Sequence, residues 1–291
     1  PLLSSETLKD LINLNNQSDI TVLGFETPDP GRYGRLLVTN NQLLKIVEAL
    51  DANDEEKKIT LCNGGVMIVK ADKLKENLSL LKNNNAKKEY ILSDLIEIIN
   101  NNGGRSLFLE CDHEETMGID SKKGLSKAEK IYQNKLRDSF MESGTTILDP
   151  ETVFFSHDTK IGKDVEIGAN IVFGEKVSIK DNVTIKSFCS IENSIIHDGS
   201  SIGPFARLRN NVDIGKDSKI GNFVELKNSS LESEVKVSHL SYIGDAEIDE
   251  AVNIGAGTIT CNYDGVKKHK TTIGKRAFIG SNSSLIAPIN I

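Results

Sequence analysis

A large apolar residue recurs at every sixth position over most of the second half of the chain. Glycine often follows it directly, and a small or branched residue often lies four positions further on. A period of six matches neither an α-helix nor a single strand. It is typical of a chain that forms one short strand, turns and repeats. The second half is therefore predicted to be a parallel β-solenoid of hexapeptide repeats. The three unbroken series are Ile161, Ile167, Phe173, Ile179, Ile185 and Ile191; Ile202, Leu208, Ile214, Ile220 and Leu226; and Ile273, Ile279, Leu285 and Ile291.

The first half has a different pattern, in which short apolar strands alternate with helical segments. Strands are expected near residues 20–25, 36–38, 43–50, 61–69 and 106–109. Ser4 is expected to cap a helix that carries Leu8, Leu11 and Ile12 on one face, and a second helix is expected over residues 90–99. This alternation predicts an α/β sheet domain.

A long amphipathic helix is expected between the two halves, with apolar residues at helical spacing from Leu125 to Phe140. Ser126 and Glu129 have the spacing of a capping box, which predicts the start of this helix, and Gly144 predicts its end. The expected organisation is a sheet domain over residues 1–122, a linker helix over 123–149 and the solenoid over 150–291.

Composition excludes several classes of protein. The formal net charge of −7 argues against binding to nucleic acid or to an anionic membrane surface. No apolar run approaches the roughly 20 residues needed to span a bilayer, and the first residues do not resemble a signal peptide. The four cysteines lack the spacing of a metal site or a disulfide framework. A cytoplasmic protein with reduced thiols is expected.

The two ends of the sequence predict that it is part of a longer protein. It begins at Pro1 without methionine and ends at Ile291, which is a core position of the repeat. Solenoids need a terminal cap to cover their open edge, so we expect further residues beyond both ends.

The exact period allows stacking to be predicted. Three hexapeptides make one turn, so residues 18 positions apart lie above one another, as Arg207 and Glu225 would in an ion pair. Arg209 and Lys227 are also 18 positions apart, which would place two cations on adjacent strands at ~4.8 Å. Such cations repel one another unless they splay into water or share an anion such as phosphate. Both outcomes are open at this point.

His239 lies between two one-residue slips of the repeat, where the wall of a solenoid can open into a pocket. A neutral imidazole there is a suitable general base for an amine or a hydroxyl, although a single histidine is more often only a surface residue. The spacing of the five histidines does not suggest a stacked metal site.

Three further segments are candidates for binding. The repeat breaks between Ile254 and Ile273, and the segment 255–265 contains a loop that suits either a binding flap or a plain insertion. Glycines in Tyr33-Gly34-Arg35 and Asn63-Gly64-Gly65 allow close approach to a sugar or nucleotide, or form ordinary turns. Asp120 is a possible metal ligand or a helix cap.

Four segments together resemble one known family. They are Ile202–Arg209, Gly221–Lys227, His239–Glu247 and Val252–Gly265. The chain is similar along its length to the bifunctional N-acetylglucosamine-1-phosphate uridyltransferases and glucosamine-1-phosphate acetyltransferases of bacterial UDP-N-acetylglucosamine synthesis. This resemblance implies that the solenoid is a left-handed β-helix, that the protein is a homotrimer, and that the first domain is a nucleotidyltransferase-type (Rossmann-like) domain truncated at its N-terminus.

The resemblance also implies residue roles in acetyl transfer. His239 would accept a proton from the 2-amino group of glucosamine-1-phosphate as that group attacks acetyl-CoA. Backbone amides near Ala256 or the Asn262 side chain would stabilise the oxyanion. The remaining contacts implied are Arg209 and Lys227 to the phosphate, Tyr242 and Asn253 to the sugar, and Ala256, Asn262, Tyr263 and Ser281 to acetyl-CoA.

For uridylyl transfer from UTP to N-acetylglucosamine-1-phosphate, the resemblance implies that Gly34, Glu48 and Asn63 contact the nucleotide sugar. Asp120 stands where the family usually has an asparagine that binds Mg²⁺, and a carboxylate is also an acceptable ligand. Because other parts of this site are expected before Pro1, the chain as given is not expected to transfer uridylyl groups.

Three alternatives are compatible with the sequence. The solenoid of a sugar-phosphate nucleotidyltransferase could serve only to form trimers or to regulate. A hexapeptide acyltransferase could act on another amino sugar. The chain could also be a non-enzymatic remnant. The joint presence of Arg209, Lys227, His239 and the Asn262-Tyr263 pair favours an acetyltransferase over a purely structural coil.

Overall fold

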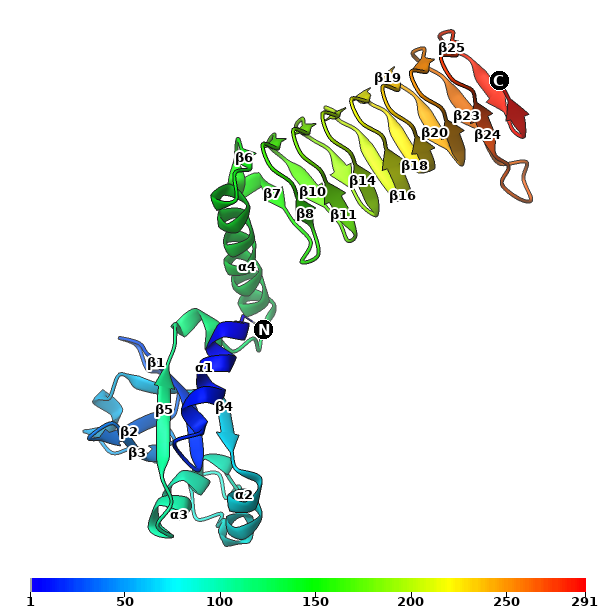
Figure 1. Ribbon diagram of the computed structural model, residues 1–291. Coiled ribbons are helices and arrows are strands. Elements are labelled where there is room, and N and C mark those ends of the chain that lie inside the picture. Colours follow the sequence, from blue (N-terminus) through cyan, green and yellow to red (C-terminus); the bar gives the residue numbers. More distant parts are fainter. Residues whose placement is uncertain (1) are drawn as a thin grey trace. The chain divides into compact units, whose positions relative to one another are not determined.

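The computed structural model describes residues 2–291, which form two compact units, one up to Ile131 and one from Tyr132 onward (Figure 1). The first unit is a small α/β region around a mixed five-stranded sheet in the order β3-β2-β4-β1-β5. Strand β1 runs parallel to β5 and antiparallel to β4. The elements are α1 (Ser5–Asn15), β1 (Ile20–Glu26), β2 (Arg35–Thr39), β3 (Gln42–Val47), η1 (Glu56–Lys58), β4 (Leu61–Val69), α2 (Ala71–Asn77), η2 (Leu78–Leu80), η3 (Leu92–Asp94), α3 (Leu95–Asn101), β5 (Ser106–Glu110) and η4 (His113–Thr116).

The predicted strands are all present, and the core of this unit lies between the sheet and α3. Buried aliphatic side chains from β1, β2 and β3 pack against Leu95, Ile96 and Ile99 of α3. The helix expected over 90–99 is shorter than predicted, because Leu92–Asp94 forms a 3₁₀ turn before α3 begins. An α/β region is confirmed, and the finer Rossmann-like assignment stays a prediction.

The helix α1 begins as predicted, since the Ser4 side chain accepts a hydrogen bond from the Thr7 N–H at 3.0 Å. Its predicted apolar face is wrong in part. Leu11 is fully buried, but Leu8 and Ile12 are exposed. A short helix on a sheet buries only a narrow stripe, so neighbours three or four positions away lie at its margins.

Helix α4 (Lys122–Glu142) begins four residues before Ser126, so the predicted capping box is wrong. Ser121 takes this role, since its Oγ accepts a hydrogen bond from the Gly124 N–H at 3.0 Å. The predicted end is confirmed. Gly144 has φ +103°, and the Thr145 N–H donates to the Phe140 carbonyl at 3.0 Å, as at many glycine-terminated helices.

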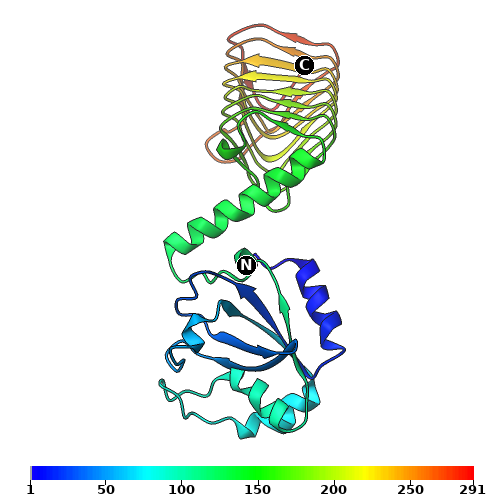
Figure 2. The same cartoon turned by 90° about the vertical axis from the view of Figure 1, so that its left-hand side faces the viewer.

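The second unit is a parallel β-solenoid with three faces, which confirms the prediction from the six-residue period (Figure 2). The short η5 (Pro150–Thr152) precedes its second strand. Its handedness, implied only by the resemblance, stays a prediction.

The strands fall into three sets, one for each face. The first face holds β6 (Thr146–Ile147), β9 (Glu166–Ile167), β12 (Thr184–Ile185), β15 (Ser201–Ile202), β17 (Lys219–Asn222), β19 (Lys236–His239), β22 (Asn253–Ile254) and β25 (Phe278–Ile279). The second face holds β7 (Val153–Phe154), β10 (Ile171–Phe173), β13 (Ser190–Ile191), β20 (Tyr242–Gly244), β23 (Ile259–Cys261), β26 (Ser284–Ile286), and the first parts of β16 (Arg207–Ile214) and β18 (Glu225–Leu231). The third face holds β8 (Lys160–Ile161), β11 (Val177–Ile179), β14 (Ser194–Ile196), β21 (Ala246–Ile248), β24 (Thr271–Ile273), β27 (Ile289–Asn290), and the second parts of β16 and β18.

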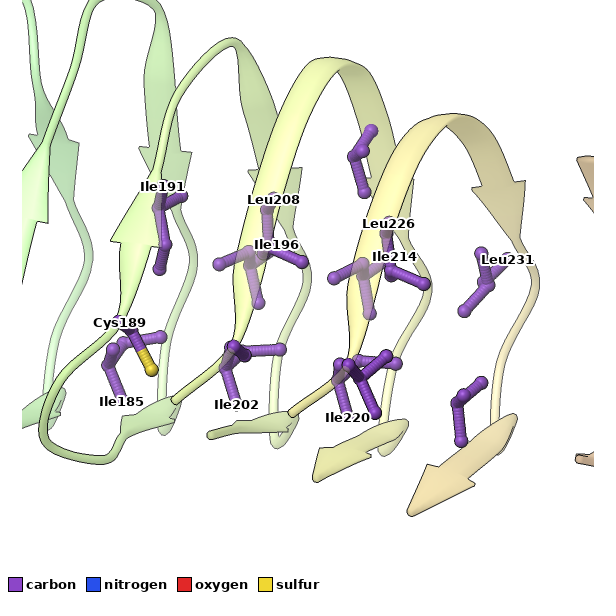
Figure 3. Packing of buried hydrophobic residues seen from close by; sticks show 14 of the residues in the cluster. Ile185, Cys189, Ile191, Ile196, Ile202, Leu208, Ile214, Ile220, Leu226 and Leu231 are labelled. Carbon is purple, nitrogen blue, oxygen red and sulfur yellow. The ribbon is translucent and has the colours of Figure 1, made fainter. Parts of the chain in front are cut away.

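The residues of the six-residue series fill the interior. Figure 3 shows Ile185, Ile202 and Ile220 in one column and Ile191, Leu208 and Leu226 in another, all pointing inward, and all are buried. Cys189 belongs to this core as a small apolar residue. Each coil therefore stacks its aliphatic side chains on those of the next, which makes the core continuous along the solenoid.

The corners of the solenoid use residues with positive φ. Asp164, Asn170, Lys176 and Asn182 recur every six residues with φ between 53° and 59°. Asparagine and aspartate tolerate this left-handed conformation best among non-glycine residues. Further along, three phenylalanines take such positions: Phe188, Phe205 and Phe223, with φ from 55° to 63°.

These three phenylalanines form an exposed ladder along one edge of the second face. The ring centroids of Phe188 and Phe205 are 4.8 Å apart and those of Phe205 and Phe223 are 5.0 Å apart, with nearly parallel rings. About half of each side chain is exposed. An exposed apolar ladder of this kind is typical of a contact with another protein surface.

The C-terminal part of α4 covers the open end of the first coil. The Gln133 side chain donates to the Phe155 carbonyl at 2.8 Å and accepts from the Phe155 N–H at 2.9 Å, as a neighbouring strand would. The buried Arg137 donates to the Val153 carbonyl at 2.9 Å and lies over the Phe154 ring. The helix thus satisfies backbone groups that an uncovered edge would leave unpaired.

Candidate functional site

The predicted stacking of Arg209 on Lys227 is confirmed by the strand register, which pairs these residues in β16 and β18. A third cation, Lys268, joins them from the loop between β23 and β24. The contact with Lys268 is the main cause of a lowered pKa at Lys227, followed by burial and by repulsion from Lys268 and Arg209. An anion bound by this cluster of three cations would be favourable, because it would offset their mutual repulsion.

Glu225 orients the arginine of this cluster. Arg209 Nε lies 2.6 Å from Glu225 Oε1, whereas Arg207 Nη1 lies 4.0 Å from the same oxygen. The expected pair of Arg207 and Glu225 is therefore shared with Arg209, which forms the shorter contact. Glu225 lies two positions before Lys227, which is the register partner of Arg209. This contact therefore draws the Arg209 side chain back along β18 toward the start of that strand.

His239 ends strand β19 and lies exposed at the corner between the first and second faces. Its Nδ1 lies 2.6 Å from Oδ1 of Asn222, which is its register partner one coil below. An amide oxygen only accepts hydrogen bonds, so Nδ1 carries the proton and Nε2 of the neutral ring keeps its lone pair. The side chain is thereby prepared to accept a proton at Nε2.

The second face joins these two groups. His239 stands at one edge, Lys227 at the other, and Tyr242 lies between them on β20, with Gly244 as the register partner of Lys227. His239 and Gly244 are five positions apart, so their Cα atoms are at most ~17 Å apart. A pocket on this face is lined by residues that include Tyr242, Glu225 and Phe223.

The loop predicted within residues 255–265 begins later than the glycines at 255 and 257 suggested. Strand β23 still pairs within the coil, and the excursion spans residues 262–270 before β24 (Figure 1). Asn262 is buried and donates to the Asp245 carboxylate, whose other oxygen accepts from Asn228 at 2.6 Å. Tyr263 is exposed on the loop. The chain therefore places Asn262 and Tyr263 on the same side of the solenoid as Lys227.

The other residues predicted to bind the sugar or acetyl-CoA lie on different parts of the solenoid. Ala256 lies near His239, since the Gly257 N–H donates to the His239 carbonyl at 3.3 Å, and the Asn282 N–H beside Ser281 donates to the Ala256 carbonyl at 2.8 Å. Asn253 lies on the first face, where it pairs with Lys236 and Phe278. Within one chain, Asn253 is thus not brought onto the face that carries Tyr242.

In the first unit, Gly34, Glu48 and Asn63 lie close together. The Asn63 N–H donates to the Gly34 carbonyl at 2.8 Å, and a Cβ at Gly34 would lie 3.4 Å from Glu48 Oε1. Gly64 and Gly65 form a β-bulge, because Val22 pairs with Met67 while Gly24 already pairs with Asn63.

Asp120 is exposed and lies just before α4. Within residues 2–291, no three histidine, cysteine, aspartate or glutamate side chains are grouped as a metal site. Asp120 would thus offer Mg²⁺ one carboxylate. This is compatible with the usual binding of Mg²⁺ by one or two carboxylates together with substrate phosphates and water.

Sequence reasoning missed two residues of the site. Asn222 precedes His239 by 17 positions rather than 18, so a strict stacking rule does not pair them, although counting the one-residue slip would have found it. Lys268 follows the break in the repeat, and no period predicts where a loop residue returns. The part of the chain that the structure describes contains no helix long and apolar enough to cross a membrane.

Comparison with known proteins agrees with this architecture. The family model described as bacterial transferase hexapeptide (six repeats) matches residues 158–193 and 193–228, within the solenoid. The crystal structure of a UDP-N-acetylglucosamine acyltransferase matches 48% of this chain and 66% of its own chain, with 20% identity and a TM-score of 0.30. The repeats and the coil they form define a hexapeptide-repeat protein.

Relatives along the whole sequence are more specific. Bifunctional protein GlmU of Ruegeria sp. is 49% identical over 291 residues, which are 100% of this chain and 65% of that protein. Bifunctional protein GlmU of Rhizobium rhizogenes is 51% identical over 278 residues, which are 96% of this chain and 61% of that protein. The chain belongs to the GlmU family, and it spans somewhat less than two thirds of the length of these relatives.

Proposed function

We propose that the solenoid transfers the acetyl group of acetyl-CoA to the 2-amino group of glucosamine-1-phosphate. The observation that carries this proposal is the arrangement on the second face, with an anion site at one edge and a histidine with a free Nε2 at the other. A phosphate bound by Arg209, Lys227 and Lys268 relieves the repulsion between them. A sugar over Tyr242 then extends toward His239.

The chemistry follows from this placement. The amine lone pair attacks the thioester carbonyl, a C–N bond forms, and the C–S bond to coenzyme A breaks. His239 Nε2 accepts the proton that the amine loses, and the thiolate leaves and is protonated to the thiol. The developing oxyanion needs donors, which backbone amides beside Ala256 or the Asn262 side chain would supply. Tyr263 and Ser281 are proposed as further acetyl-CoA contacts.

A second copy of the chain completes this site in the proposal. Asn253 lies on the first face, so it would contact the sugar bound on the second face of a neighbouring chain. The exposed ladder of Phe188, Phe205 and Phe223 borders the second face and offers an apolar surface for that neighbour. These features support the homotrimer that the family resemblance implies. The left-handed form of the coil is proposed from that resemblance alone.

For the intact protein we also propose uridylyl transfer from UTP to N-acetylglucosamine-1-phosphate. The proximity of Gly34, Glu48 and Asn63 supports a nucleotide-sugar contact in the first unit, because a carboxylate and an amide side chain pack together beside the bare backbone of Gly34. Asp120 would hold Mg²⁺, which neutralises phosphate charge when bound. A cytoplasmic location, where both reactions would occur, stays a prediction.

The phosphate on the acceptor provides the test. Thiol release from acetyl-CoA is measured with glucosamine-1-phosphate and with unphosphorylated glucosamine. The proposal predicts release with the phosphorylated sugar and a KM at least tenfold higher for glucosamine, since ion pairs to three cations would be lost. Equal use of both sugars would contradict the anion site. It would favour a hexapeptide acyltransferase for another amine.

A further inference from the structure

The loop of residues 262–270 closes on itself through one carboxylate. Asp264 Oδ1 accepts hydrogen bonds from the Val266 and Lys267 N–H groups, both at 2.8 Å. The two arms of the loop pair at Tyr263 and Lys268, and the His269 N–H donates to the Asn262 carbonyl at 2.8 Å. The loop is therefore a small hairpin with a turn at its tip.

A side-chain contact ties the tip of this hairpin to its base. Asp264 Oδ2 lies 2.6 Å from His269 Nε2. The backbone N–H of Lys267, then His269 and the N–H of Val266, hold the pKa of Asp264 well below its usual range, so this carboxylate stays ionised. His269 is only 24% exposed.

The charges around His269 come from its own loop and from the coil beneath it. On the loop these are Asp264 and the neighbouring Lys268 and Lys270. The coil contributes Asp213, Asp245 and Glu247 to the pocket that His269 lines. Each of these carboxylates already has a partner. Asp213 contacts His197, Asp245 accepts from Asn228 and Asn262, and Glu247 pairs with Lys270. Asp264 is thus the acceptor that His269 contacts directly.

Lys268 needs such support, because its neighbours repel it. It lies beside Lys227, and no carboxylate within residues 2–291 forms an ion pair with it. Left free, a lysine of this kind would turn into water. Its backbone is instead fixed by the hairpin. Successive residues of an extended segment point to opposite sides, so a contact that fixes His269 on one side also fixes the direction of Lys268 on the other.

We propose that Asp264 and His269 are positioning residues that hold Lys268 in the cation cluster and so set the affinity for the phosphorylated acceptor. This inference rests on the function proposed for the solenoid. Neither residue touches the reacting atoms. Asn262 is held separately by Asp245, so the pair acts on Lys268 more than on Asn262.

Kinetics of two variants test this role. His269→Ala removes the donor to Asp264, and His269→Gln restores a side-chain N–H. His269→Ala is expected to raise the KM for glucosamine-1-phosphate about tenfold and to change kcat less than about twofold, the size of one lost charge-assisted hydrogen bond. His269→Gln is expected to recover most of that loss. His157→Ala, on a remote coil, is the matched control and should leave the KM unchanged. An unchanged KM in His269→Ala would overturn the proposal.

A double-variant cycle shows whether the effect passes through Lys268. In a Lys268→Ala background, His269→Ala should cause no further rise in KM, because the group that it positions is already gone. Equal and additive effects in both backgrounds would contradict a positioning role.

Hydrogen exchange provides a readout that does not depend on catalysis. The amides of residues 266, 267 and 269 should exchange faster in His269→Ala than in the unaltered chain, while those of β20 should not change. Equal exchange at all three amides would overturn the inference. Absence of acetyl transfer in the unaltered chain would instead count against the proposed function. The exchange rates would still show whether His269 stabilises the hairpin of residues 262–270.

Discussion

His239 Nδ1 and Asn222 Oδ1 lie 2.6 Å apart across two adjacent coils of the solenoid. This contact selects the tautomer whose free lone pair is on Nε2, and it also fixes the orientation of the ring. Because Asn222 lies on β17 and His239 on β19, the rigid stacking of the coils sets the distance between them.

Replacing Asn222 by alanine should therefore lower kcat for acetyl transfer by about tenfold, since the ring loses the hydrogen bond that orients it. The KM for glucosamine-1-phosphate should change little, because the cation cluster lies at the other edge of the face. Steady-state kinetics with both substrates measure this. A variant with normal kcat would show that the tautomer is set by something other than Asn222.

The lowered pKa of Lys227 predicts how acceptor binding depends on pH. Lys227 binds a phosphate while it is protonated, and this charge is lost as the pH rises through its lowered pKa. Lys268→Ala removes the main cause of that lowering, so the pKa rises toward its ordinary value. Acceptor affinity should then fall at a higher pH than in the unaltered chain, although it is weaker overall because one cation is missing.

The KM for glucosamine-1-phosphate is measured from neutral to alkaline pH for this comparison. Lys270→Ala serves as control, since Lys270 pairs with Glu247 instead of joining the cluster. The pH at which the KM rises should shift in Lys268→Ala and not in Lys270→Ala. If this pH is the same in both variants as in the unaltered chain, the coupling of Lys227 to Lys268 has no role in binding.

The cover that α4 provides for the first coil predicts a stability effect. Gln133→Leu keeps the size of the side chain but leaves the Phe155 N–H and carbonyl without partners in a buried place. The expected cost is about 2–4 kcal/mol of unfolding free energy, or a Tm lower by about 5–10 °C. Thermal unfolding followed by circular dichroism measures it. Lys135→Leu on the exposed side of α4 is the control, and equal Tm values for the two variants would refute the capping role.

The phenylalanine ladder predicts the state of assembly. Asparagine accepts the positive φ of Phe205 and Phe223 at least as well as phenylalanine does, so Phe→Asn changes there remove the rings without straining the chain. The double variant should dissociate from trimer to monomer and lose most acetyl transfer. Sedimentation gives the mass, with Ile195→Asn on the third face as control. A stable trimer in the double variant would exclude the ladder as the contact.

Much of the solenoid could be predicted from its sequence because a fixed period converts directly into stacking. The pairing of Arg209 with Lys227 follows from their 18-residue spacing, and the structure has that register. The same rule fails where one residue is missing from a coil, as between Asn222 and His239. It also cannot place Lys268, whose position depends on how a loop folds back.

Local signals were less reliable in the first half of the chain. The capping box at Ser126 and Glu129 has the right spacing, yet α4 already runs through it from Lys122. Capping patterns occur inside helices by chance, and only the actual path of the backbone separates the two cases. The burial of Leu11 but not of Leu8 or Ile12 likewise depends on where α1 meets its sheet.

The most direct test of the account is the formation of N-acetylglucosamine-1-phosphate. The chain is incubated with acetyl-CoA and glucosamine-1-phosphate, and the product is measured by mass spectrometry for the unaltered protein and for His239→Ala. The account predicts acetylated product from the unaltered chain and a loss of at least a hundredfold in rate for the variant. Equal rates from both would contradict the role of His239 as the base and would favour a solenoid that only assembles the protein.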